Sequence, residues 1–344
     1  MLRGLDPREI DEVIGQILGD GSAEEEGDFP ERGIIDVKGD FSGESFQLFE
    51  PAKAKFKMLA VDGGSATILD GGSFLVAGVR VGQVIFEGEE CDREASGNPE
   101  MHVFEISLAS LSEAYTIFYE KSVGGAPPDS PRGLEEGVGR IRTLMEWKRV
   151  ENALEKGLPI GSILAFDGAL WAGIKGIGDM LERIVLAARE KGITLCGISK
   201  RSMLTHKGVP LIPKVQMAGE EFHPKKAWFL PLEIGSRYAK KEFGKVFVAK
   251  LHPYSNHVFR VDLALPEGAG AAEALGKLAA LSNDPTYVGY PYPLARVHND
   301  VAFSHAEVEE LRHLLRKRAL DRGMEPKTWH LTFQEFHDIL DTNR

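Results

Sequence analysis

Short apolar runs alternate with longer amphipathic stretches along most of the chain. The first run, residues 58–61, predicts a buried strand that ends at Asp62, before a Gly-Gly-Ser turn. Residues 73–81 and 83–86 predict two further strands joined across a glycine. Apolar residues at helical spacing then predict a helix over residues 101–121.

The middle of the chain alternates helix and strand. Residues 134–157 predict a long helix that stops at a glycine, and residues 162–170 predict a strand that repeats the apolar-Asp-Gly pattern of the first one, with Asp167. A helix over 177–192 and a strand over 193–200 follow. This alternation predicts an α/β fold, and the hairpin strands near the start make its central sheet mixed rather than purely parallel.

The remaining pattern divides the chain into three parts. Residues 1–52 predict an N-terminal helix and an acidic linker, and the compact body is expected over 53–315. Within that body, residues 245–253 and 257–265 predict an antiparallel pair, and a Pro-rich turn leads to a helix with His298 at the junction. Residues 316–344 predict a C-terminal helical extension, so peripheral helices flank the core.

Composition restricts the location and class of the protein. No window approaches the roughly 18 apolar residues that a membrane span needs, and the amphipathic start carries charges unlike a signal peptide. The two cysteines, Cys91 and Cys196, are far apart and lack a CxxC partner. These features argue against a disulfide framework, a zinc-thiolate site and a membrane protein, and they favour the reducing cytoplasm.

The formal net charge of −11 disfavours nucleic acid as a partner, but one region departs from it. Residues 199–250 hold eleven Lys or Arg against four Asp or Glu, with aromatic residues between them. Such a region is either a solvated surface of mixed charge or a surface that binds successive phosphates of a nucleic-acid strand. The candidate phosphate contacts are Lys200, Arg201, Lys207, Lys214, Lys225 and Lys226.

Asp62 and Asp167 each follow an apolar strand and precede glycine. A single such Asp is usually a turn residue, but two on neighbouring strands bring like charges together, which is unfavourable unless a cation bridges them. Oxygen ligands suit Mg²⁺ or Mn²⁺. We expect a third carboxylate from the helix that lies between Asp62 and Asp167 in the sequence. The candidates are Glu146 and Glu151, although either one considered alone would be interpreted as a solvent-exposed acidic residue on the helix surface.

His298 gains a role beside such an acidic group. Next to the carboxylates, the imidazole of His298 is able to bind a second metal ion or to transfer a proton. Without the carboxylates, His298 would be interpreted as a residue that caps a helix or packs in the core. Lys200 and Arg201, at the tip of another predicted strand, are placed to hold non-reacting phosphate oxygens. Carboxylates that bind two divalent ions are a recurring arrangement for displacement at phosphorus.

The order of these motifs resembles the NurA nuclease family. "AVDGGS", a Glu-bearing helix, "AFDGAL", "GISKRS", "HVFRVDL" and "GYPYPLARVHND" carry the resemblance, which covers residues 53–315. It implies an RNase H-like core and a homodimer around a central channel. It also implies Mn²⁺-dependent 5′–3′ exonuclease and single-strand endonuclease activity on DNA ends, with Mg²⁺ as the alternative ion. The implied partner is HerA, a hexameric DNA-translocating ATPase of recombinational repair.

The family pattern assigns Asp62, Asp167, His298 and a helix Glu, taken as Glu146, to metal binding and catalysis. The chain departs from the family's usual single glycine before serine, because it has Gly63 and Gly64. That difference predicts a shifted loop after Asp62 with the carboxylate in place.

Two other classes fit parts of the pattern. An actin-like or sugar-kinase-like ATPase also has a strand followed by Asp-Gly, but it needs a second phosphate loop, and "LDGGSF" at residues 69–74 follows the first too closely. A catalytically silent partner of a DNA translocase would be expected to lose at least one acidic residue, whereas this chain keeps the full set.

Overall fold

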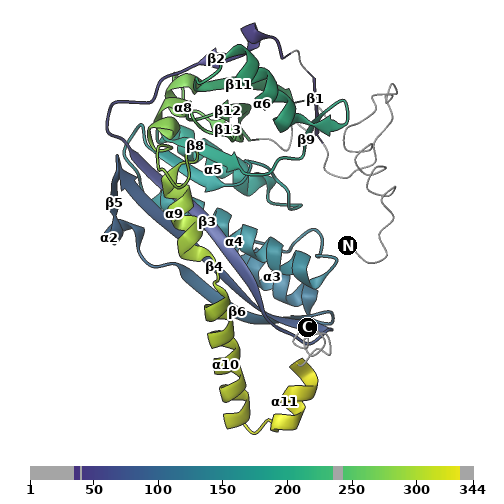
Figure 1. Ribbon diagram of the computed structural model, residues 1–344. Helices are drawn as coiled ribbons and strands as arrows, with labels where there is room; N and C mark the ends of the chain where they lie inside the picture. Colours follow the sequence, from purple (N-terminus) through teal and green to yellow (C-terminus); the bar gives the residue numbers. More distant parts are fainter. Residues whose placement is uncertain (1–34, 39–40, 235–242, 334–344) are drawn as a thin grey trace.

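The computed structural model describes residues 35–38, 41–234 and 243–333 (Figure 1). Its strands form one sheet in the order β10-β9-β1-β11-β12-β13-β8-β7-β3-β4-β5, with β2 beside β11 and β6 beside β4. The strands are β1 (Ile35–Lys38), β2 (Gln47–Leu48), β3 (Lys57–Asp70), β4 (Phe74–Glu87), β5 (Glu90–Asp92), β6 (Glu100–Ser107), β7 (Ile163–Asp167), β8 (Thr194–Ser199), β9 (Leu204–His206), β10 (Val209–Pro210), β11 (Trp228–Ile234), β12 (Lys245–Lys250) and β13 (Phe259–Ala264).

Helices cover the sheet and extend from it. They are η1 (Gly43–Ser45), α2 (Arg93–Ser96), α3 (Leu111–Ser122), α4 (Leu134–Lys156), α5 (Gly178–Glu190), α6 (Leu211–Phe222), α8 (Ala271–Ala280), α9 (Tyr292–Val301), α10 (His305–Asp321) and α11 (Pro326–Phe333). No helix among the described residues is long and apolar enough to cross a membrane.

The centre of the sheet has the RNase H-like arrangement that the sequence predicts. Strands β3, β4 and β6 form an antiparallel meander. Strand β7 then pairs parallel to β3 and β8 pairs parallel to β7, with α4 leading into β7 and α5 connecting β7 to β8. The fold is therefore α/β with a mixed central sheet, and the parallel strands bring their carboxyl ends to one edge.

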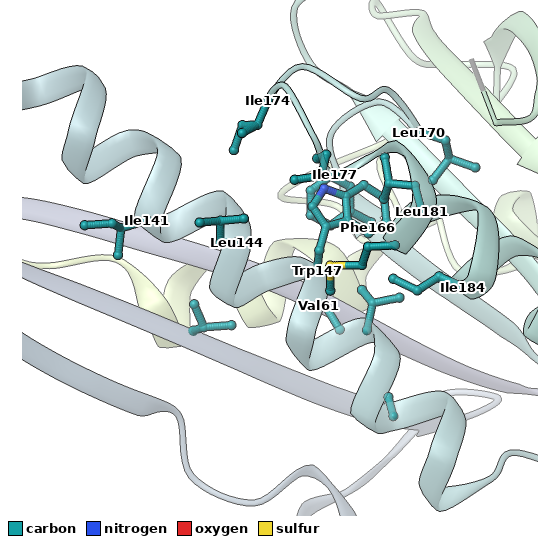
Figure 2. Packing of buried hydrophobic residues seen from close by; sticks show 14 of the residues in the cluster. Val61, Ile141, Leu144, Trp147, Phe166, Leu170, Ile174, Ile177, Leu181 and Ile184 are labelled. Atoms are coloured by element: carbon teal, nitrogen blue, oxygen red, sulfur yellow. The ribbon is translucent and has the colours of Figure 1, made fainter. Parts of the chain in front are cut away.

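Two apolar layers fix the helices on this sheet. On one face α3, α4 and α5 bury a cluster in which Trp147 of α4 stacks on Phe166 of β7, their ring centroids 4.5 Å apart (Figure 2). On the opposite face α8 and α9 bury alternate residues of the same strands, including Met58 and Ala60 of β3. Since side chains alternate across a strand, each residue of β3 belongs to one of these two faces.

The second half of the sheet is antiparallel except where β1 pairs parallel to β9, and it carries the basic region, residues 199–250. The predicted pairing of residues 245–253 with 257–265 is confirmed as β12 against β13, and β13 also pairs with β8. Helix α6 packs there on a third apolar cluster. Two of the interleaved aromatic residues, Trp228 and Phe229, are buried, and Lys250 is buried in an ion pair with Glu220, so these three side chains are unavailable to a nucleic acid.

Three local predictions from the sequence are wrong. Asp62 does not end its strand, because β3 runs on through the glycines to Asp70, and β4 is likewise one strand where two were predicted. Glycine is able to adopt extended backbone as readily as a turn, so the Gly-Gly-Ser signal misled the prediction. Strand β6 occupies the first half of the helix predicted over 101–121, because the helical spacing holds only within α3.

The ends of the chain differ in how much is described. The N-terminal helix and most of the acidic linker predicted from the sequence lie outside the described residues. Toward the C-terminus, α10 extends away from the sheet with α11 beside it (Figure 1). Arg80 of β4 pairs with Glu307 of α10 at 2.9 Å, and Arg312 donates to the carbonyl of Ile68, so the base of α10 is tied to the hairpin. The domain limits at residues 52 and 315 stay predictions.

Candidate metal centre

Asp62 lies on β3, directly after the last residue of that strand that pairs with the neighbouring strand β7. The parallel pairing of β3 with β7 stops at Val61 and Phe166, while the pairing with β4 continues past Asp62 opposite Gly82. Alternation places Asp62 on the same face as Met58 and Ala60, the face that α9 covers. The carboxylate is 5% exposed and accepts a hydrogen bond from the backbone N–H of Gly63 at 2.8 Å.

Asp167 is the last residue of β7 and joins Asp62 at this edge of the sheet. It lies on the same face as Ile163 and Ala165, two residues apart along the strand. The Nζ of Lys200, just after β8, is 2.5 Å from its Oδ2. The structure thus meets the condition on which the sequence argument depended, that the strands carrying the two carboxylates are neighbours.

His298 lies in the last turn of α9, not at the junction before it as predicted. Its Nδ1 is 2.8 Å from Oδ2 of Asp62 and 4.0 Å from Oδ2 of Asp167. One ligand atom from each of these three residues lies within 4.8 Å of the others. The two acids come from the sheet and the imidazole from the helix packed on it, so the fold brings together residues up to 236 positions apart.

The electrostatics of this cluster fit a divalent cation. Burial raises the pKa of Asp62, and the nearby Asp167 raises it further, against the lowering effect of the hydrogen bond from His298. Two carboxylates and an imidazole at one point form a donor set for a divalent metal ion. A bound cation would offset the repulsion that the structure places there.

Glu146 approaches the cluster from the other face of β3. It is 4% exposed on α4, and the Nε of Arg142 lies 3.3 Å from its Oε1. Burial raises its pKa to about 8, with Arg142 opposing the rise and Asp62 and Asp167 adding to it. Its carboxylate is outside the group of three ligand atoms within 4.8 Å that the described residues form.

Glu151, the alternative from the same helix, has different surroundings. Its Oε2 is 2.7 Å from the Nζ of Lys148, and its Oε1 is 3.7 Å from Arg183 on α5. These partners hold its carboxylate on the helix surface between α4 and α5. Glu146 is buried beside the sheet, whereas Glu151 pairs with residues on the helix surface. We therefore favour Glu146 over Glu151 as the carboxylate that α4 contributes. The role of Glu146 as a metal ligand stays a prediction.

The two glycines after Asp62 make room for the elements that carry Glu146 and His298. A Cβ on Gly63 would lie 2.5 Å from Oε1 of Glu146, and a Cβ on Gly64 would lie 2.2 Å from the carbonyl oxygen of Val301, at the end of α9. The extra glycine thus does not create the shifted loop predicted from the sequence, because both glycines lie within β3. It allows α9 to cross the strand closely.

Gly64→Ala is expected to lower stability by about 1–3 kcal/mol, the usual cost of overpacking. The added methyl group meets backbone atoms that are unable to rotate away, so the end of α9 must shift. Chemical denaturation checks this, with Gly139→Ala as the matched control because its Cβ on α4 meets open space. The control is expected to be neutral or more stable by up to about 1 kcal/mol. Equal stability of the wild type and Gly64→Ala would contradict the close crossing.

The six predicted phosphate contacts are all exposed. Lys200 and Arg201 follow β8 directly, and Lys207 lies in the turn between β9 and β10. The others lie on α6 or in the loop after it, namely Lys214, Lys225 and Lys226. Lys200 alone among these reaches the carboxylate cluster, and the DNA-binding role of all six stays a prediction.

Two features near the centre were not predicted as parts of it. Asp262 of β13 is fully buried, accepts a hydrogen bond from Nε of Arg260 at 2.7 Å, and accepts another from the backbone N–H of Leu170 at 2.9 Å, which anchors the loop that follows Asp167. Tyr290 lies under Lys200, whose Nζ is 5.3 Å from the ring centroid. Burial, with Asp167 and Asp62, raises the pKa of Tyr290 well above its ordinary value. Asp262 belongs to the "HVFRVDL" motif and Tyr290 to the "GYPYPL" motif, and these motifs were the sequence signals by which the two residues could have been found.

The fold and the cluster define an α/β protein with an RNase H-like core and a candidate metal centre at the carboxyl ends of its parallel strands. The NurA domain family matches residues 56–303, which is more than half of the chain. The chain therefore belongs to the NurA family.

Solved structures resemble the chain over most of its length. The crystal structure of the NurA nuclease from Sulfolobus solfataricus has a TM-score of 0.57 at 17% identity and covers 83% of this chain and 91% of that one. A further crystal structure of NurA has a TM-score of 0.48 at 9% identity, over 94% and 100% of the two chains. Endonuclease V from Ciona intestinalis in complex with DNA has a TM-score of 0.38 at 11% identity, over 82% and 92%. The curated proteins contain no match.

Proposed function

We propose that this protein is a divalent-metal-dependent DNA nuclease that hydrolyses phosphodiester bonds at DNA ends. The observation that carries the proposal is the meeting of Asp62, Asp167 and His298 within 4.8 Å at the edge of an RNase H-like sheet. Membership of the NurA family and the fold shared with the Sulfolobus solfataricus NurA nuclease support it. Family membership also favours it over the actin-like ATPase alternative.

Each residue of the centre has a role in this proposal. Asp62 and Asp167 hold the metal, His298 completes its ligands or moves a proton on the attacking or leaving side, and Glu146 supplies the remaining negative charge from below the strand. When bound, one or two divalent ions would make water a better nucleophile and offset the charge that develops on the leaving oxygen. Lys200, now paired with Asp167, is placed to contact a non-reacting phosphate oxygen.

The finer assignment follows from the family resemblance. We assign Mn²⁺ as the ion, with Mg²⁺ as the alternative, and both 5′–3′ exonuclease and single-strand endonuclease activity. We further assign a homodimer, a HerA-type hexameric ATPase as partner, a role in recombinational repair, and a cytoplasmic location. Light scattering on the purified chain tests the dimer, and co-purification with the ATPase tests the partnership.

Binding of DNA by this acidic chain is expected to weaken as salt rises, because Lys and Arg release counterions from the phosphates. Replacing either Lys225 or Lys226 by Ala is expected to reduce the slope of log K against log salt by about 1, the value for one phosphate contact. Fluorescence anisotropy in EDTA measures this without cleavage. Lys121→Ala, on α3, is the matched control for loss of one positive charge. A salt-independent affinity would contradict phosphate tracking by the basic region.

Digestion of end-labelled single- and double-stranded DNA tests the proposed function directly. Cleavage with Mn²⁺ or Mg²⁺ and none in EDTA is the expected result. Absence of cleavage by the isolated protein, followed by cleavage when the ATPase is added, would mark a nuclease that needs its partner. Absence under both conditions would favour the silent translocase subunit instead.

A further inference from the structure

A pocket of about 560 Å³ opens directly beside the candidate metal centre. His298 and Lys200, which both contact the carboxylate cluster, also line this pocket. Its size falls in the range of roughly 300–1,000 Å³ that small-molecule sites occupy. Whatever occupies the pocket therefore lies next to any phosphate held at the cluster.

Two loops build the pocket, and contacts between them fix its shape. One loop joins β12 to β13 and the other joins α8 to α9. Ser255 of the first is buried and bonds both backbone groups of His257, while Gly289 of the second packs so closely that a Cβ there would lie 2.2 Å from Oγ of Ser255. Gln216 on α6 donates to the carbonyl of Asn256 at 2.8 Å. The walls are thus held in place before any ligand arrives.

The lining is aromatic and without negative charge. Tyr254, Tyr287, Tyr290 and Phe259 supply rings, and the amides of Asn256 and Asn299 supply donors and acceptors. None of the described residues that line the pocket carries a carboxylate. Tyr254 and Tyr287 are 73% and 43% exposed, so each offers ring surface to a ligand, and the ring of His252 lies 5.8 Å from that of Tyr254 between centroids. This combination suits a flat, uncharged ring with polar edges.

We propose that this pocket binds one unpaired nucleobase of the DNA strand whose phosphate lies at the metal centre, with Tyr254 as a stacking surface. The inference rests on the proposed nuclease function and specifies its substrate. Stacking on an aromatic ring tolerates every base, so the site selects unpaired nucleotides rather than a sequence. The enzyme thus requires at least one nucleotide freed from its partner strand near the bond that it cleaves.

A substrate and a variant that each remove the same stacking interaction test this. The substrates are single-stranded oligonucleotides with one abasic nucleotide at successive positions, and the proteins are the wild type, Tyr254→Ala and Tyr254→Phe. At one position, loss of the base is expected to lower kcat/KM of the wild type about tenfold, and Tyr254→Ala is expected to lower it about as much on intact DNA. The abasic substrate and Tyr254→Ala together are expected to lower kcat/KM no more than either change alone. Tyr254→Phe is expected to have the kcat/KM of the wild type on both substrates.

Controls separate the pocket from stability and from the nuclease function. Leu186→Ala removes an exposed apolar side chain from α5 and is expected to change neither rate nor binding. Melting curves check that Tyr254→Ala remains folded. Anisotropy in EDTA repeats the comparison as binding. If the wild type cleaves nothing either alone or with the ATPase added, the nuclease proposal fails, and the binding comparison still decides the pocket. Multiplicative losses, or no position at which the base matters, would overturn the pocket proposal.

Discussion

Asp62→Asn and Asp167→Asn are each expected to lower Mn²⁺-dependent DNA cleavage by about 10³-fold or more. Both carboxylates face one point at the sheet edge, 4.0 Å or less from Nδ1 of His298. Loss of one carboxylate removes a negatively charged metal ligand, and with it several kcal/mol of stabilisation of the charge in the transition state. Each 1.36 kcal/mol corresponds to about a tenfold change in rate. Asn keeps the shape of the side chain, so the fold is expected to persist.

Asp70→Asn is the matched control for these variants. It makes the same change at the far end of the same strand, where the side chain is exposed and accepts a hydrogen bond from the N–H of Gly72 in the nearby turn. Its cleavage rate is expected to equal that of the wild type. Single-turnover digestion with excess enzyme measures the rates of the wild type and of the three variants. Cleavage that survives both Asp62→Asn and Asp167→Asn would place the active metal centre elsewhere in the chain.

The sequence was sufficient to predict that Asp62 and Asp167 lie close together because the relevant signals are local. An apolar run followed by Asp-Gly marks the end of parallel pairing for both β3 and β7, and parallel neighbours must bring those ends together. His298 was found by its motif, but its position inside α9 was not, because nothing in "PLARVHND" shows where the helix begins relative to the sheet.

The sequence was insufficient where tertiary contacts override a local signal. Gly63 and Gly64 were predicted to form a turn, yet they lie in a strand because the antiparallel pairing of β3 with β4 continues through them. The buried Asp262 looked like an ordinary strand residue, since its bond to the N–H of Leu170 joins segments 92 residues apart. Such long-range pairing has no periodic pattern that a single sequence reveals.

Glu146→Gln is expected to raise the melting temperature of the metal-free protein, by an amount that grows from about pH 5 to about pH 8 and then stays constant. The pKa of Glu146 is raised from 4.5 to about 8 in the folded state, chiefly by burial. Below pH 4.5 the group is protonated in both states and costs nothing. Between the two values the unfolded state ionises first, so stability falls as pH rises, and above about 8 the loss is complete. Gln carries no such charge, and a difference of several degrees at pH 9 is expected.

Added Mn²⁺ is expected to reverse this order near pH 7. A cation at the cluster favours ionised carboxylates, so the wild type gains more stability from the metal than Glu146→Gln does. Melting curves in EDTA and in Mn²⁺ measure both effects, with Glu151→Gln as the control because its carboxylate pairs with Lys148 and Arg183 instead. A lower melting temperature of Glu146→Gln in EDTA at pH 9 would mean that the ion pair with Arg142 outweighs the cost of burial. Equal gains from Mn²⁺ in the wild type and Glu146→Gln would remove Glu146 from the metal centre and leave Asp62, Asp167 and His298 as its ligands.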